Sequence, residues 1–178
     1  MSEFKKFKPV TRKLGKASVL LREVKHSDAA GLNEIINDPK VREFISVEGP
    51  VSLSETKAKI RESLRNAAHK WIVAEADGKV VGSLYLTRNK GIMSHSGNFG
   101  ISLAKEEWGT GLASALMDAV FAFAKRNGIT AIHSSTGADN KRAHAFYKKK
   151  GFKFVGAYHK QRKRGRKFID TLLMEKFF

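Results

Sequence analysis

The stretch from Asn98 to Phe152 reads NFGISLAKEEWGTGLASALMDAVFAFAKRNGITAIHSSTGADNKRAHAFYKKKGF, and it decides the fold. Its first part, Phe99–Leu103, is typical of a strand and leads into a glycine-spaced turn, GTG at 109–111. A helix follows this turn at once. Because the first N–H groups of a helix are unpaired and its dipole is positive there, such a turn favours an anion. The stretch therefore predicts a bound phosphate or pyrophosphate.

Two common phosphate-binding loops do not fit this turn. A P-loop requires a lysine directly after its last glycine, and no lysine follows Gly111. A dinucleotide-binding fingerprint requires a third glycine where this chain has Ser114. If the turn binds an anion, it belongs to a third kind of phosphate-binding turn.

The turn and its surroundings resemble the GNAT superfamily of N-acetyltransferases. The family's acyl-CoA loop is Gln or Arg, two residues, Gly, one residue, then Gly or Ala; residues 108–113, WGTGLA, match it except that Trp108 replaces the cation. Downstream, Asn140, AFY at 145–147 and GF at 151–152 resemble a second family signature. With the hairpin-like segment 73–82 and the final segment 170–176, the resemblance covers Val19 to Lys176.

The order of strands and helices predicts one mixed α/β domain. The resemblance implies a single-domain GNAT-like fold, in which a mixed, mostly antiparallel seven-strand sheet has helices on both faces. We predict a basic N-terminal arm over residues 1–17 and the acetyltransferase domain over residues 18–178. The N-terminal half, with Asn37-Asp38-Pro39, is somewhat similar to the branch that acetylates the N-termini of ribosomal proteins.

Local patterns place the elements within this domain. Ser27 and Ser52 are predicted helix caps, and Ser52 with Glu55 forms a capping-box pattern. We predict inward-facing side chains at Ala29, Leu32, Ile36, Ile60 and Leu64, and at Leu112, Leu116, Val120 and Phe123. The predicted strands are 18–24, 71–75, 79–87, 94–103, 130–135, 153–158 and 168–176, and the two later helices are 109–126 and 140–150. Residues 160–167 are predicted to form a basic turn region.

The resemblance also implies the residues that bind acetyl-CoA. The backbone N–H groups expected at the pyrophosphate are those of Gly109, Thr110, Gly111, Leu112 and Ala113, beside Trp108 and the charge of Lys105. The strand residues expected along the pantetheine are Ile101, Ser102 and Leu103. Asn140 is expected both to cap its helix and to contact the cofactor. Tyr147 is expected to contact the cofactor and to act as general acid to the CoA sulfur, because a phenol donates a hydrogen bond while neutral.

The general base is left open by the sequence. Many relatives carry a glutamate about where Asn98 stands, and an asparagine does not accept a proton usefully. His95 is the nearest titratable side chain with a suitable intrinsic pKa, so it is our catalytic candidate for this step. Glu75 is a second candidate, for which a structural role at a strand end is the competing interpretation. A chain of water molecules that carries the proton away would require neither His95 nor Glu75.

Composition excludes several other chemistries. The chain has 178 residues, 42% of them hydrophobic, and suits one domain. It has no cysteine, which excludes disulfides, thiolate zinc sites and an acetyl-cysteine intermediate, so direct transfer in a ternary complex is favoured. The six histidines show no metal-ligand spacing, and we predict no metal. No apolar run approaches the ~20 residues of a membrane span. We therefore predict a cytoplasmic protein without membrane contact.

The positive charge suggests further partners. The net charge is +17, and residues 141–167 contain twelve Lys and Arg without any Asp or Glu. Such a surface attracts acetyl-CoA, and it also suits a ribosomal or nucleic-acid partner. The predicted acceptor is a primary amine, either a protein N-terminus or a small amine. A homodimer is carried as a hypothesis. The alternative function is a non-catalytic module on the same fold that senses CoA or binds nucleic acid.

Overall fold

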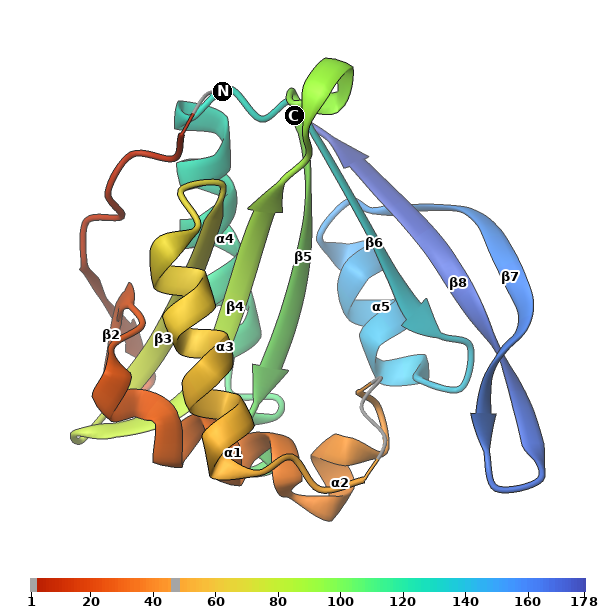
Figure 1. Cartoon of the computed structure of the whole chain (residues 1–178), viewed down its shortest axis with the longest axis horizontal. Coiled ribbons are helices and arrows are strands. Elements are labelled where there is room, and N and C mark those ends of the chain that lie inside the picture. The colour runs from red at the N-terminus through yellow and green to blue at the C-terminus, as the bar shows by residue number, and fades with distance from the viewer. Residues whose placement is uncertain (1–2, 46–48) are drawn as a thin grey trace.

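A computed structural model describes residues 3–45 and 49–178 (Figure 1). Its strands form one sheet in the order β1-β2-β3-β4-β5-β6-β8-β7. The strands are β1 Val10–Leu14, β2 Ala17–Glu23, β3 His69–Ala76, β4 Lys79–Arg88, β5 Ser96–Leu103, β6 Ala131–Gly137, β7 Lys153–Arg164 and β8 Lys167–Phe177. Neighbouring strands pair antiparallel, except for β5 and β6, which are parallel.

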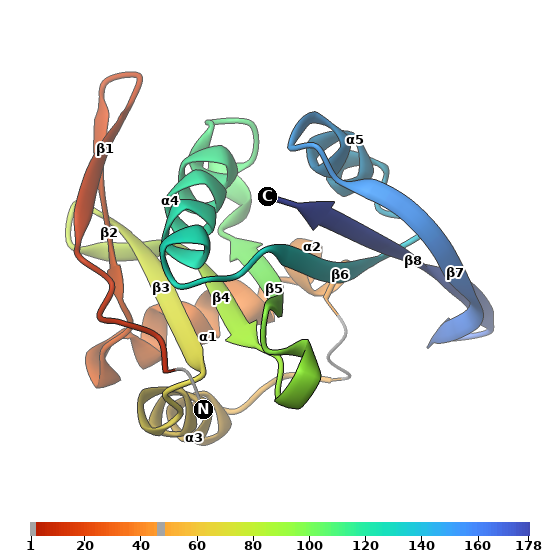
Figure 2. The ribbon, with the colours of Figure 1, turned by 90° about the horizontal axis from the view of Figure 1, so that it is seen from above.

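Helices cover both faces of this sheet. The helices are α1 Ala29–Asn37, α2 Pro39–Arg42, α3 Leu53–Arg65, α4 Leu112–Arg126 and α5 Lys141–Lys149. Figure 2 shows α4 and α5 on one face, and α1 and α3 on the other. The predicted mixed, mostly antiparallel α/β fold is thereby confirmed. None of the helices in the described ranges is both long and apolar enough to cross a membrane.

The sheet has eight strands rather than the predicted seven. The additional strand, β1, lies within the predicted basic arm and pairs antiparallel with β2. The arm is anchored just before this strand, because Phe4 and Phe7 are 6% and 3% exposed and their rings lie 5.5 and 5.6 Å from that of Phe123. The sequence does not predict β1, because this edge strand exposes Thr11–Lys13 and therefore lacks the alternation of apolar and polar residues that identifies a strand. Residues 1 and 2 of the arm lie outside the described part of the chain.

The helices confirm most of the predicted inward faces. Leu112, Leu116, Val120 and Phe123 of α4 are all buried. The capping box of α3 is present, since the Glu55 amide donates to Ser52 Oγ at 3.2 Å and the Ser52 amide donates to Glu55 Oε2 at 2.7 Å.

Three local predictions were wrong. Leu64 is 46% exposed, because the buried stripe of α3 runs through Thr56, Ile60 and Ser63, and residue 64 is turned about 100° from residue 63. Ser27 lies inside a 3₁₀ turn, His26–Asp28, and does not cap α1. The predicted basic turn region over 160–167 is mostly strand, because β7 continues to Arg164 through an irregularity at Lys160, which has φ 54°.

Candidate active site

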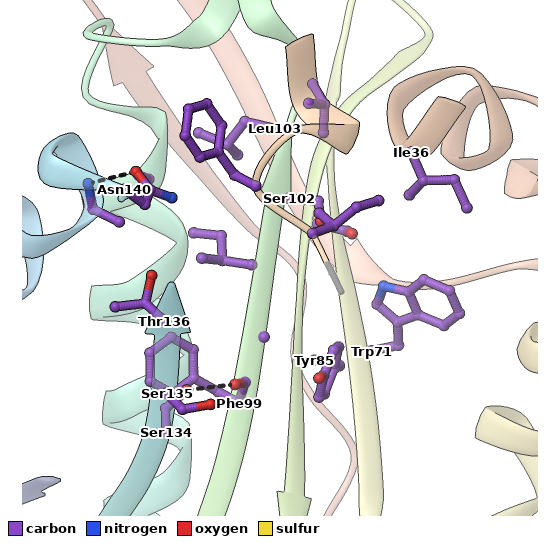
Figure 3. Close-up of a pocket in the computed structure, with 18 of the residues that line it drawn as sticks. Ile36, Trp71, Tyr85, Phe99, Ser102, Leu103, Ser134, Ser135, Thr136 and Asn140 are labelled. Atoms are coloured by element: carbon purple, nitrogen blue, oxygen red, sulfur yellow. Dashed lines mark hydrogen bonds between the residues drawn. The ribbon is translucent and has the colours of Figure 1, made fainter. Parts of the chain in front are cut away.

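The sheet divides where β5 meets β6. These two strands pair only through Ser96–Asn98 and Ala131–His133, and then diverge (Figure 1). Just beyond the pairing, Ser134 Oγ donates to the carbonyl of Phe99 at 3.0 Å (Figure 3). From Gly100 to Leu103, β5 has β4 as its only strand partner in the described chain, so one edge of its backbone faces the opening.

A cavity of about 790 Å³ occupies this opening. In Figure 3, Ser134, Ser135, Thr136 and Asn140 lie on one side of β5, and Trp71 and Tyr85 lie on the other. The predicted site residues that line the cavity are Ile101, Ser102, Leu103, Trp108, Gly109, Ala113, Asn140 and Tyr147. The fold therefore brings together residues from β5, from the turn before α4, and from α5.

The glycine turn directly precedes α4. Gly111, at φ 94°, is the N-cap of α4, and Gly109 has φ 86°. Both values lie in the left-handed region that favours glycine. The helix begins at Leu112 rather than at the predicted residue 109, because a left-handed residue cannot belong to it. Thr110, Gly111 and Leu112 are not among the cavity-lining residues, although their backbone forms the turn that leads from Gly109 to Ala113.

Arg142 places a positive charge beside this turn, although Trp108 stands where the family loop has a cation. The guanidinium carbon of Arg142, in the first turn of α5, lies 3.5 Å from the centroid of the Trp108 ring, and both residues line the cavity. The face of an indole ring attracts a cation, so this stacking stabilises the position of the Arg142 guanidinium. Lys105 is engaged elsewhere, because its Nζ is 2.8 Å from Asp38 Oδ2.

Asn140 and Tyr147 occupy the two ends of the same helix. Asn140 Oδ1 accepts a hydrogen bond from the Ala143 amide at 3.1 Å, which confirms its capping role. Tyr147 is 8% exposed, and its ring lies 5.8 Å from that of Phe99. Burial, with a smaller effect of the Tyr85 charge, raises the pKa of Tyr147 to about 12. The phenol is therefore neutral over the ordinary range of pH.

The structure does not bring the predicted base candidates to the cavity. His95 precedes β5, is exposed, and has Nδ1 3.2 Å from the carbonyl oxygen of Ile92. Glu75 accepts a hydrogen bond from Arg22 Nε at 2.8 Å, as its structural interpretation requires. Asn98 donates to Asn89 Oδ1 at 2.7 Å. None of these three residues lines the cavity.

Sequence reasoning missed a group of polar residues on β3, β4 and α3. His69, Trp71 and Tyr85 line the cavity, together with Glu62 and Ser63 of α3. Ser63 Oγ and Trp71 Nε1 are buried and have no hydrogen-bond partner in the described ranges. The available signal was the alternation of His69 with Trp71 and of Tyr85 with Thr87, which places all four side chains on one face of the hairpin.

Comparison with known proteins agrees with this geometry. A family model described as the acetyltransferase (GNAT) domain matches residues 18–153. The chain belongs to the GNAT acetyltransferase family. Its membership confirms the predicted enzyme class, an acyltransferase. A comparison with curated proteins gives no match.

Solved GNAT structures share the fold over nearly their whole length. A GNAT-family acetyltransferase from Streptococcus pneumoniae is 26% identical, with a TM-score of 0.78 and with 90% of this chain and 99% of that chain covered. A ribosomal-protein-alanine N-acetyltransferase from Brucella melitensis is 22% identical, with a TM-score of 0.79 and coverage of 89% and 99%. The proposed acetyltransferase yncA from Salmonella typhimurium, solved with acetyl-CoA, is 17% identical, with a TM-score of 0.79 and coverage of 89% and 93%.

Proposed function

We propose that this protein transfers the acetyl group of acetyl-CoA directly to a primary amine while both substrates are bound. The observation that carries the proposal is the cavity between the diverging strands β5 and β6, which Tyr147 lines from α5. The cavity also reaches the turn before α4. The cavity thus extends from the N-terminal end of α4, which suits an anion, to the buried, neutral hydroxyl of Tyr147.

The residues fit acetyl-CoA as a substrate. The N–H groups of residues 109–113 suit the pyrophosphate, because Gly109 and Gly111 carry no side chain that would block its approach. Two of these groups make weak bonds that the pyrophosphate would replace: the Thr110 amide donates to the Glu107 carbonyl at 3.4 Å, and the Leu112 amide donates to Thr110 Oγ1 at 3.3 Å. Ile101–Leu103 offer an unpaired strand edge, which suits the amide groups of pantetheine. Arg142, stacked on Trp108, adds a positive charge near the turn.

Tyr147 suits the role of general acid. Its hydroxyl makes no hydrogen bond to protein in the described ranges, and its phenol holds its proton at neutral pH. The departing thiolate of CoA needs a proton or a hydrogen bond. Tyr147 would supply it from α5.

A polypeptide N-terminus is the acceptor that we favour. A solved relative is named a ribosomal-protein-alanine N-acetyltransferase, which supports such an acceptor. The unpartnered Ser63 Oγ and Trp71 Nε1 beside the cavity are groups that a peptide backbone could satisfy. The exposed cations of the β7–β8 hairpin favour an anionic partner, including a ribosomal surface. The cytoplasmic location and the homodimer stay predictions.

An acetyl-transfer assay tests this function. Purified protein, free of nucleic acid, is given acetyl-CoA with peptides that have a free N-terminus, with the same peptides blocked there but containing lysine, and with small amines. We expect release of CoA thiol together with an acetylated product found by mass spectrometry. If the protein binds CoA but transfers nothing, it is a sensor. If it binds RNA tightly at physiological salt and transfers nothing, the nucleic-acid module is correct.

The pyrophosphate site predicts the effect of Gly111→Asp. The variant places a carboxylate beside the bound anion and should weaken CoA binding by more than tenfold, about 1.4 kcal/mol or more, in isothermal titration calorimetry. Gly128→Asp is a matched control at the other end of α4, because its φ of 76° imposes the same backbone strain. Equal CoA affinity in both folded variants would place the pyrophosphate elsewhere.

A further inference from the structure

Strand pairing places His69 in line with the position of the missing glutamate. His69 of β3 is paired with Thr87 of β4, and Thr87 is paired with Asn98 of β5. The next row on the same face is Trp71, Tyr85 and Gly100. Because side chains alternate along a strand, His69, Trp71, Tyr85 and Thr87 share the face that lines the cavity.

The imidazole of His69 is held in one orientation. Its Nδ1 lies 2.8 Å from Thr87 Oγ1, and its ring stacks on that of Tyr85 with centroids 5.6 Å apart and an angle of 22°. In the tautomer whose Nδ1–H donates to Thr87 Oγ1, Nε2 carries the free lone pair and is the ring nitrogen that can accept a proton. A base must be within hydrogen-bond reach of the proton that it removes, directly or through one water.

Tyr85 connects this imidazole to the strand edge at the opening. A Cβ added to Gly100 would come within 2.5 Å of the Tyr85 ring and within 2.6 Å of its hydroxyl. Glycine at position 100 thus allows Tyr85 to lie flat across β5, where that strand separates from β6. His69, Tyr85 and Gly100 all line the cavity.

We propose that His69 is the general base that deprotonates the acceptor amine, which binds beside Tyr85. This inference rests on the proposed function. Among the described residues that line the cavity, the only other side chain able to accept a proton near neutral pH is Glu62, which is exposed on α3 and has no oriented contact.

The reaction then balances as follows. Nε2 takes one proton from the ammonium form of the acceptor. The freed lone pair forms a bond to the thioester carbon, and the carbon–sulfur bond breaks with its electron pair on sulfur. Tyr147 protonates the sulfur and recovers a proton from the new amide nitrogen, and His69 releases its own proton to solvent. The products are the acetylated amine, CoA thiol and one proton.

The surroundings keep His69 unprotonated at neutral pH. Burial lowers the pKa of His69 below 6.5, although the charge of Glu62 opposes this effect. The charged and titratable groups around the cavity are Lys59 and Glu62 on α3, Tyr85 on β4, Arg142 and Tyr147 on α5, and Arg162 on β7. A weak base matches an α-amine, with a pKa of about 7.7–8.0, better than a lysine amine at about 10.4.

The test is the pH dependence of kcat/KM for wild type and His69→Gln. The wild-type rate should fall about tenfold per pH unit below the pKa of His69. His69→Gln should lower kcat/KM at pH 7.5 by about 10²- to 10⁴-fold, lose this acid limb and keep its affinity for acetyl-CoA. His159→Gln, on the exposed part of β7, is the matched control and should retain the wild-type profile.

A second variant distinguishes catalysis from structure. His69→Ala should regain activity when imidazole is added, which a merely structural residue would not allow. If His69→Gln keeps the acid limb while His95→Gln or Glu62→Gln loses it, the inference is overturned. Failure of the wild type to acetylate any amine would instead refute the proposed function, so the two failures are distinguishable.

Discussion

Replacing Tyr147 with phenylalanine should lower kcat by about 10- to 10⁴-fold, the range for a lost general acid. The substitution removes only the hydroxyl. The ring stays in its aromatic cluster, 5.8 Å from Phe99 and 5.7 Å from Phe152, so the core keeps its packing. Affinity for acetyl-CoA should change little. The measurement is single-turnover acetyl transfer, in which the chemical step is observed directly.

A matched control is Tyr158→Phe, because Tyr158 is 54% exposed on β7 and should not affect the rate. Since the pKa of Tyr147 is about 12, the wild-type rate should show no alkaline limb from this residue below pH 10. A wild-type single-turnover rate in Tyr147→Phe would reduce Tyr147 to a core aromatic residue.

Much of the cofactor side of the site follows from local sequence. The turn at 109–111 and the helix after it are adjacent in the chain, and local sterics determine both the left-handed glycines and the buried stripe of α4. Asn140 is likewise predictable, because a cap depends on the backbone three residues away. The stacking of Arg142 on Trp108 is not predictable in this way, since it depends on how α5 docks beside the turn.

The acceptor side depends on long-range strand register, which the sequence does not show. His95 is three residues from Asn98 in the chain, yet it lies outside the cavity. His69 is 29 residues from Asn98, yet two antiparallel pairings through Thr87 place both in one row. Proximity in sequence therefore does not reveal a histidine that strand pairing brings into the same row.

The missed strand and the extended hairpin have a related cause. β1 and the outer part of β7 lie at the two edges of the sheet. An edge strand has a neighbouring strand on one side only, so it tolerates polar and charged residues. Lysine and arginine therefore replace the apolar alternation by which strands are recognised. In β1, the apolar anchor precedes the strand, at Phe4 and Phe7.

Glu75, a candidate base in the sequence, belongs in the structure to an ion-pair network with Arg22 and Asp28. Arg22 of β2 binds Glu75 Oε2 at 2.6 Å and also binds both oxygens of Asp28 at 2.8 Å. Arg22 and Asp28 are 8% and 5% exposed. The network joins β2 and β3 to the turn that starts α1, the helix whose Ile36 lines the cavity.

Replacing Asp28 with asparagine should therefore destabilise the protein by about 3 kcal/mol, because removing one partner leaves a buried charge only partly compensated. For a domain of this size that loss corresponds to a fall in Tm of about 6–12 °C. Asp118→Asn is the matched control. It removes an ion pair with Lys150 in which the Asp118 side chain is 64% exposed, and should cost less than about 1 kcal/mol.

The effect of Asp28→Asn should also depend on pH. Although burial alone would raise the pKa of Asp28, hydrogen bonds from Arg22 and from the Lys25 amide lower it below 3.8. A carboxyl whose pKa is lower in the folded state stabilises the protein fully above about pH 5, and this contribution is lost as the pH falls through 3.8 towards the folded-state pKa. The difference in unfolding free energy between wild type and Asp28→Asn, measured by urea denaturation, should shrink over that range. A difference that is constant from pH 7 to pH 3 would show that the lost stability comes from packing rather than from the charge of Asp28.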